Sequence, residues 1–153
     1  MPIFTVRTRR GEAARGYSKS AAARVKASAM NIVIGSEDKY LSANLRRIVQ
    51  DQKIFAISTN RVERILKEMK MRDRAAVLDV SWKALQEPGV LKQIVNIARI
   101  SGNFVICVCP NQEEDLKKLA KASRAHSVFI RYDLETTFKE RIGELYLESG
   151  ATR

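Results

Sequence analysis

The sequence predicts an α/β domain in which a parallel sheet is covered by helices on both faces, preceded by a basic arm. Two observations predict this class. From residue 30 onward, apolar runs of strand length alternate with longer segments of helical period. The strand runs, such as Phe104–Val108, are continuously apolar, which is typical of strands buried on both faces of a parallel sheet. A length of 153 residues fits one such domain and its arm.

The predicted elements form five consecutive βα units between residues 30 and 150. The strands are expected at 31–35, 54–59, 75–81, 103–109 and 126–131. The helices are expected at 37–51, 61–72, 89–101, 112–123 and 134–149. We expect Ser36 and Asn60 to cap the first two helices, and Tyr40, Leu41 and Leu45 to lie on the inward face of the first. Right-handed crossovers then give a three-layer (βα)5 sandwich, for which we predict the flavodoxin-like strand order 2-1-3-4-5.

The formal charge of +11 is concentrated in the arm of residues 1–29. The arm has one acidic residue and seven basic ones, Arg7, Arg9, Arg10, Arg15, Lys19, Arg24 and Lys26. Its Arg, Ser, Ala and Gly content cannot bury enough apolar surface to fold alone, so we expect it to be flexible. We prefer the interpretation that it docks on an acidic protein surface or a larger assembly. Alternatives are a nucleic-acid contact, with Phe4 and Tyr17 available for stacking, and an organelle transit segment.

Several function classes have no signature in this chain. It lacks a glycine-rich phosphate loop, a G-x-G-x-x-G motif and a serine elbow. The sole histidine, His126, has no companion ligands and is expected to be an ordinary surface or capping residue. Cys107 and Cys109 are expected on opposite strand faces, as reduced thiols that fill the core. We therefore predict a cytoplasmic protein that is not an enzyme, has no cofactor or metal, and has no apolar run long enough to enter a membrane.

Three residues carry a resemblance to a known family. Asp79 ends the third predicted strand, Cys109 follows it by thirty residues and Arg131 by fifty-two. With the run Arg131-Tyr-Asp-Leu-Glu135, this spacing resembles the receiver domains of bacterial response regulators over residues 30–149. The resemblance implies that Asp79 stands at the phosphoacceptor position, Cys109 at the position of the switch hydroxyl, and Arg131 at that of the invariant lysine.

The departures from that family concern the phosphoryl-transfer chemistry. Receivers hold a divalent cation with the acceptor and two acids at the end of the first strand. Here either Gly35 and Ser36 or Ser36 and Glu37 take the two acidic positions, so at most one acid remains.

The other key positions of the receiver site depart too. Cys109 is a far weaker hydrogen-bond donor than a hydroxyl, Arg131 differs from lysine in reach and geometry, and Tyr132 replaces a proline. We expect Asp79 and Arg131 to survive as an ion pair, with Asp79 a structural carboxylate. The site is predicted to be a degenerate receiver site.

We therefore predict a non-catalytic pseudo-receiver that serves as a protein-interaction module in regulation or assembly. Its candidate partner contacts are the seven basic arm residues, Tyr17, Trp82, Tyr132 and the surface from Arg131 to Tyr146. Trp82 either packs over the degenerate site or anchors a partner, and we prefer packing.

The alternatives are a phosphorylatable response regulator and a nucleic-acid-associated regulator that uses the arm and a basic second helix. That helix and its exit contain Arg61, Arg64, Lys67, Lys70, Arg72 and Arg74, for which a solvated face is the simpler interpretation. Glu113–Asp115 is expected to be a solvated first turn.

Overall fold

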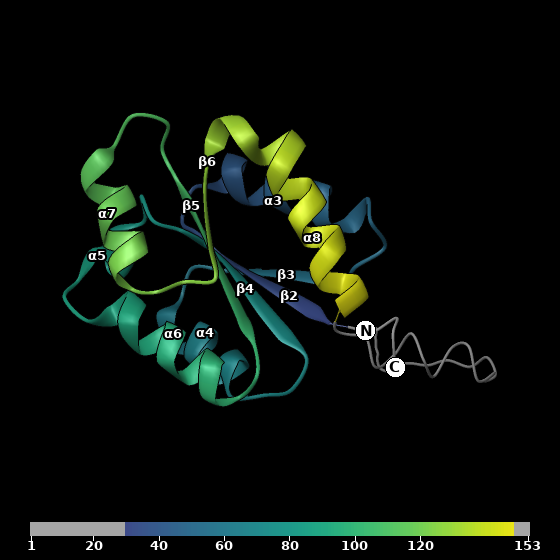
Figure 1. The fold of residues 1–153 in the computed structure, drawn as a ribbon, viewed down its shortest axis with the longest axis horizontal. Helices are drawn as coiled ribbons and strands as arrows, with labels where there is room; N and C mark the ends of the chain where they lie inside the picture. The colour runs from purple at the N-terminus through teal and green to yellow at the C-terminus, as the bar shows by residue number, and fades with distance from the viewer. Residues whose placement is uncertain (1–29, 149–153) are drawn as a thin grey trace.

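The computed structural model describes residues 30–148 and contains one five-stranded parallel sheet between two layers of helices (Figure 1). The strands are β2 (Asn31–Gly35), β3 (Ala56–Thr59), β4 (Arg74–Asp79), β5 (Phe104–Cys109) and β6 (Ser127–Ile130). Their spatial order, β3-β2-β4-β5-β6, is 2-1-3-4-5 when strands are counted along the chain. The predicted flavodoxin-like fold is therefore confirmed. The arm of residues 1–29 and the last residues of the predicted domain, 149 and 150, lie outside the described residues.

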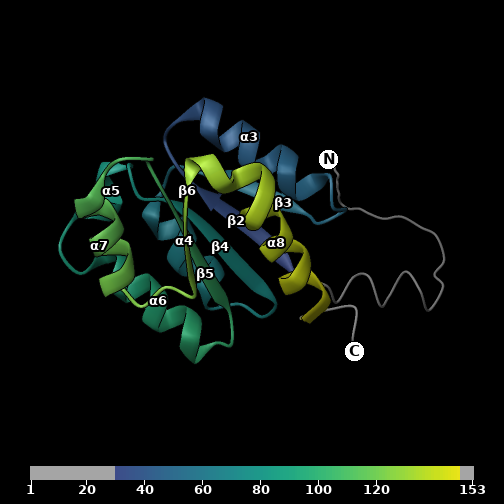
Figure 2. The same ribbon diagram turned by 45° about the horizontal axis from the view of Figure 1, so that its top comes forward.

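Helices cover both faces of the sheet. On one face α3 (Lys39–Gln50) and α8 (Lys139–Tyr146) lie side by side (Figures 1 and 2). The other face carries α4 (Val62–Met69), α5 (Lys83–Gln86), α6 (Val90–Ile100) and α7 (Glu114–Ala122). Between β6 and α8 the chain forms a 3-10 turn, η1 (Arg131–Asp133), and a π-helical turn, η2 (Leu134–Phe138). None of the helices within residues 30–148 has the length and apolar character needed to cross a bilayer.

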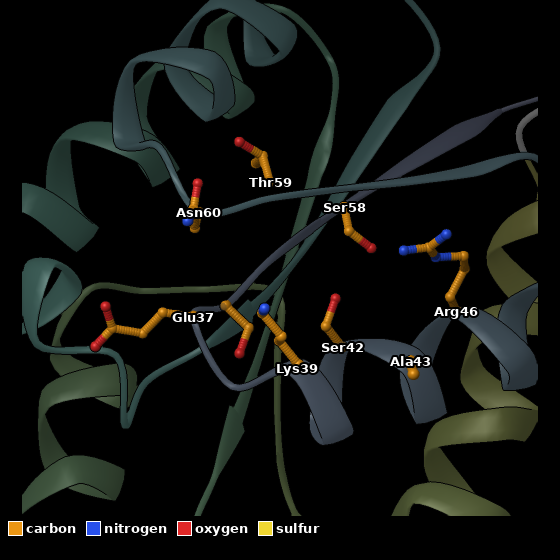
Figure 3. A pocket seen from close by; sticks show the side chains of 9 residues that line it. Glu37, Lys39, Ser42, Ala43, Arg46, Ser58, Thr59 and Asn60 are labelled. Carbon is orange, nitrogen blue, oxygen red and sulfur yellow. The ribbon is translucent and has the colours of Figure 1, made fainter.

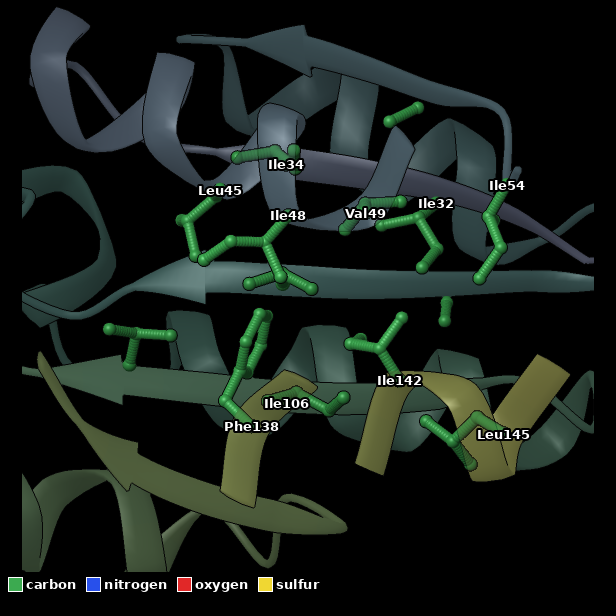
Figure 4. Close-up of a cluster of buried hydrophobic side chains, with 14 of the residues drawn as sticks. Ile32, Ile34, Leu45, Ile48, Val49, Ile54, Ile106, Phe138, Ile142 and Leu145 are labelled. Carbon is green, nitrogen blue, oxygen red and sulfur yellow. The ribbon is translucent and has the colours of Figure 1, made fainter. Parts of the chain in front are cut away.

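Each strand contributes side chains to two separate cores, one on each face. Ile32 and Ile34 of β2 point toward α3 and α8, whereas Val33 between them points toward α4 and α6. Alternate residues of a strand face opposite sides, so a strand with helices on both sides must be apolar at every position. Figure 4 shows the α3 and α8 core, where these side chains meet: Ile32, Ile34, Leu45, Ile48, Val49, Phe138, Ile142 and Leu145.

The start of α3 differs from the prediction. Its N-cap is Asp38, whose carboxylate accepts hydrogen bonds from the backbone N–H groups of Tyr40 and Leu41 at 3.0 and 3.1 Å. Ser36 is not the cap, because its hydroxyl is used elsewhere. Tyr40 is not on the inward face either; it is 90% exposed, whereas Leu41 and Leu45 are buried.

Asn60 is also not a cap. The N-cap of α4 is Arg61, which has no side-chain capping bond and donates its own N–H to Thr59 Oγ1 at 3.1 Å. Met69 ends this helix earlier than predicted, and a left-handed residue, Asp73 (φ 57°), redirects the chain into β4. Three short elements, α5, the 3-10 turn η1 and the π-helical turn η2, were not predicted.

The expected geometry of the cysteines was wrong. Residues two apart on a strand share a face, and Cys107 and Cys109 both belong to the core beneath α4 and α6. Both are free and fully buried. Burial raises the pKa of the Cys107 thiol to about 12 and that of Cys109 to about 11, so both thiols are protonated and unreactive at neutral pH.

Candidate functional site

The candidate site lies where the carboxyl ends of the central strands meet. In the sheet register Gly35 pairs with Leu78, and Asp79 pairs with Val108. Ser36, directly after β2, therefore lies beside Asp79 at the end of β4. The strand order reverses between β2 and β4, because their following helices cover opposite faces of the sheet, and such a switch point is where open α/β sheets bind ligands.

Asp79 is a buried carboxylate whose two oxygens accept hydrogen bonds from its own chain. The residue is 1% exposed. The Ser36 hydroxyl donates to Oδ2 at 2.6 Å. The backbone N–H and the hydroxyl of Ser81 donate to Oδ1 at 3.0 and 2.5 Å. Hydrogen bonds to a charged acceptor are strong, about 1.5–3 kcal/mol each, so these contacts hold the carboxylate in one position.

Arg131, the first residue of η1, supplies positive charge to this carboxylate. Its Nη2 lies 3.7 Å from Asp79 Oδ1 and 3.7 Å from Asp38 Oδ2, and it donates to the Ser81 hydroxyl at 3.3 Å. The predicted pair of Asp79 and Arg131 is therefore present. The guanidinium lies between two carboxylates, so one cation ties the start of α3 to the ends of β4 and β6.

Two residues of this arrangement were missed at the sequence level. Asp38 both caps α3 and faces Arg131, and an acid just before a run of helical period is a recognisable capping signal. Ser81 follows Asp79 by two residues, and its N–H closes the local turn that aspartate side chains commonly form. Both signals were available in the sequence, but neither indicates by itself a contact with the third strand or with Arg131.

Residues 35–37, the candidates for the two acidic positions, lie in three different environments. A Cβ on Gly35 would lie 2.6 Å from Ile65 Cδ1 and 3.1 Å from Leu78 Cδ2, so no acidic side chain fits at that position. Glu37 is exposed. Of the three candidates, Ser36 is the one that contacts Asp79, and it brings a neutral hydroxyl where a carboxylate would be needed.

These residues do not fit the divalent cation that phosphoryl transfer to aspartate requires. Magnesium needs carboxylate oxygens free to coordinate it, and both oxygens of Asp79 accept hydrogen bonds. The Asp38 carboxylate caps a helix, and the positive charge between the acids belongs to Arg131. Within residues 30–148 no three His, Cys, Asp or Glu side chains lie close enough together to hold a metal ion. The arrangement instead links three loops through one buried carboxylate.

Cys109 does not donate to Asp79. Its sulfur lies in the core beneath α7, and its hydrogen-bond partner is the backbone carbonyl of Leu116 at 3.8 Å. The thiol is thus on the same sheet edge as Asp79 but serves as a core residue.

Two aromatic candidates for partner binding have different positions. Trp82 is only 4% exposed and packs into the core beside Ile65 and Leu85. Packing is therefore the correct interpretation, and Trp82 is not available as a partner contact. Tyr132 is 76% exposed, while its backbone N–H donates to Asn111 Oδ1 at 2.9 Å. The ring of Tyr132 therefore faces solvent, while the hydrogen bond to Asn111 fixes its backbone.

His126 has a structural role rather than that of a plain surface residue. Its Nδ1 accepts a hydrogen bond from the backbone N–H of Val105 at 3.0 Å, and its ring meets Phe104 edge-on at 5.1 Å. Burial and the nearby Arg99 lower the pKa of His126. The neutral imidazole therefore helps to fix the start of β6 against β5.

The basic second helix is partly neutralised by its own acids. Glu68 accepts hydrogen bonds from Arg74 Nε at 2.8 Å and Arg64 Nε at 3.2 Å, and Arg61 lies 3.9 Å from Glu63. Burial by itself raises the pKa of Glu68, but the two arginines outweigh burial and hold it below the ordinary value. Three cations have no ion pair with described residues: Lys67, Lys70 and Arg72.

The acidic run 113–115 is exposed as predicted, and Glu114 pairs with Lys117 at 3.3 Å.

Comparison with known proteins gives matches at the level of structure. No protein-family model matches the chain, and no curated protein matches its sequence. The receiver domain of the Saccharomyces cerevisiae response regulator Ssk1, solved in complex with the histidine phosphotransfer protein Ypd1, has a TM-score of 0.64 and 13% identity over 80% of this chain and 92% of that chain. A response regulator receiver protein from Burkholderia phymatum has a TM-score of 0.61 and 15% identity over 76% of this chain and 94% of that chain.

A third structure with this fold comes from another context. A putative pilus assembly protein, cpaE, from Burkholderia thailandensis has a TM-score of 0.57 and 16% identity over 81% of this chain and 99% of that chain. The described domain therefore has the fold of response regulator receivers, as the spacing of Asp79, Cys109 and Arg131 predicts.

Proposed function

We propose that this chain is a cytoplasmic pseudo-receiver, a non-catalytic module that docks on a protein partner or a larger assembly. One observation carries the proposal: the buried carboxylate of Asp79 is already bound by Ser36, Ser81 and Arg131. The oxygens of Asp79 are engaged in structural contacts, so neither is free to accept a phosphoryl group.

Phosphoryl transfer would have to dismantle that contact. The attacking oxygen must be free and in line with the leaving group, and a cation must neutralise the developing charge. Here Oδ2 accepts the Ser36 hydroxyl and Oδ1 accepts two bonds from Ser81. Exposing either oxygen costs about 1.5–3 kcal/mol for each broken bond, and Ser36 offers no carboxylate to bind the cation that would repay this cost.

Docking is supported by features outside the site. Tyr132 presents an exposed ring next to Arg131, and exposed tyrosines are common anchors in protein interfaces. The seven cations of residues 1–29 favour a partner with an acidic surface. Of the proteins with this fold, the Ssk1 receiver is bound to a protein partner and cpaE is described as a pilus assembly protein.

The first test is phosphorylation of the full chain by acetyl phosphate with magnesium, followed by intact mass measurement. We expect no phosphoryl adduct. The Asp79→Asn variant measures any background at other sites. An adduct on the wild-type chain that this variant lacks would overturn the proposal.

The second test measures docking by affinity capture with the full chain as bait. We expect partner proteins whose recovery falls with Tyr132→Ala and with a full-length variant in which the seven arm cations are glutamine. Tyr40→Ala is the matched control, because Tyr40 is 90% exposed on α3 and lies outside the proposed surface. Recovery of nucleic acid alone, with no protein dependent on Tyr132, would reject the proposal in favour of nucleic-acid binding.

A further inference from the structure

We propose that a groove between α3 and the end of β3 binds a small phosphorylated sugar, either free or as part of a nucleotide. The groove has a volume of about 480 Å³ and opens beside the Asp79 site. Its lining is polar or small and includes Lys39, Ser42, Arg46, Ser58, Thr59 and Asn60. The inference is independent of the docking role.

Two cations of α3 line the groove from the same side. Lys39 and Arg46 are seven residues apart, which is about two helical turns, so they project from one face of the helix. Neither forms an ion pair with another described residue. The adjacent Arg47, in contrast, pairs with Asp51 and Glu135. The only acid in the lining is Glu37, so the groove has a net positive charge.

The opposite wall contains a hydroxyl that lacks a partner. The Ser58 oxygen is buried and makes no hydrogen bond within the described part of the chain. Buried hydroxyls nearly always have a partner, so one without calls for an explanation. Figure 3 shows the Ser58 hydroxyl turned toward the Arg46 guanidinium across the groove. A phosphoryl oxygen between them would accept from both, and the exposed Arg46 side chain can move to admit it.

The remaining lining suits the sugar part of such a ligand. Between Arg46 and Lys39 the groove presents Ser42 and, across it, Thr59 and Asn60 (Figure 3). Side-chain hydroxyl and amide groups both donate to and accept from sugar hydroxyls, and the Glu37 carboxylate accepts from them. The N-terminal N–H groups of α3 are not part of the site, because Asp38 already binds two of them. Recognition therefore rests on side chains.

The test is calorimetric titration of the full chain with ribose 5-phosphate, adenosine monophosphate and inorganic phosphate at physiological salt. We expect one ester to bind per chain. Arg46→Ala should weaken this binding about tenfold or more, as expected for loss of a charge-assisted hydrogen bond, and Ser58→Ala should weaken it to a smaller extent. If adenosine monophosphate binds more tightly than ribose 5-phosphate, the ligand is a nucleotide. If the two bind equally, the sugar phosphate is the part that is recognised.

The matched control is Lys92→Ala, which removes an exposed cation from α6 on the opposite face of the sheet and should leave binding unchanged. Urea midpoints equal to wild type show that the variants are folded. The proposal is overturned if neither ester binds, if Arg46→Ala and Lys92→Ala have the same effect, or if inorganic phosphate binds as tightly as the esters.

Discussion

Replacing Ser36 by aspartate puts a carboxylate where the structure has a hydroxyl. The Ser36 oxygen lies 2.6 Å from Asp79 Oδ2, so the new carboxylate would lie within about 4 Å of the buried one. Two like charges at that distance repel by about 4 kcal/mol at an effective dielectric constant of 20, and the lost hydrogen bond adds about 1.5–3 kcal/mol. Attraction between Arg131 and the new carboxylate, about 3 kcal/mol at a separation of about 5 Å, offsets about half of this cost. We expect Ser36→Asp to lower the free energy of unfolding by about 3 kcal/mol.

Urea unfolding of the full chain at pH 7.5 with a chelator measures this loss. Ser36→Asn is the matched control, because the asparagine side chain has the same size as aspartate but can donate a hydrogen bond to Asp79. We expect this variant to lower the free energy of unfolding by about 1 kcal/mol. Equal losses in the two variants, or a Ser36→Asp variant as stable as wild type, would refute the reasoning that the Asp79 charge depends on this donor.

Magnesium provides a second readout of the same variant. A restored acidic pair should bind the cation, and a ligand at one hundred times its dissociation constant stabilises a fold by about 2.7 kcal/mol. We expect magnesium to stabilise Ser36→Asp and to leave the wild-type stability unchanged. Comparable stabilisation of the wild type would contradict the conclusion that its residues do not fit the cation.

Three further predictions concern Gly35, the two cysteines and Glu68. Gly35→Ala should cost about 1–3 kcal/mol in urea unfolding, because the added methyl overpacks a filled core; an unchanged midpoint would show that the core can yield. Cys107 and Cys109 should react with a thiol reagent only after unfolding, since both are buried with raised pKa values; fast labelling of native protein would contradict this. Glu68 has a lowered pKa in the fold, so its stabilising contribution is present above the ordinary value of 4.5 and is lost as pH falls through the folded-state value. Glu68→Gln should therefore lower stability at pH 7 and weaken its dependence on pH below 4.5.

The fold was predictable because each strand must be apolar at every position. A continuously apolar run such as Phe104–Val108 fits a strand that is covered by helices on both faces. Five such runs separated by helical segments indicate a doubly wound sheet, for which 2-1-3-4-5 is a common strand order. The short elements gave no such signal. α5 is a single turn, and the π-helical turn η2 shares its sequence pattern with the helix that follows it.

The site was only partly predictable, because three adjacent residues could each have played the same local part. Ser36, Glu37 and Asp38 are all plausible at the start of a helix, and the choice among them is made by contacts across 43 residues of sequence. Once Ser36 donates to Asp79, the cap passes to Asp38 and α3 begins later. The same long-range contact decides which residue takes the acidic position, and no local pattern contains that information.

The contacts of the Arg131 guanidinium bear on whether phosphorylation could switch the loops around Asp79. In a phosphorylated switch, chemistry at the aspartate moves the surrounding loops between two arrangements. Here the Arg131 side chain, which follows β6, contacts the residues after β2 and β4 without any phosphoryl group. If the chain docks as proposed, its partner would meet this arrangement without any prior modification of Asp79, and the timing of the interaction would depend on the amounts of the two proteins or on changes in the partner.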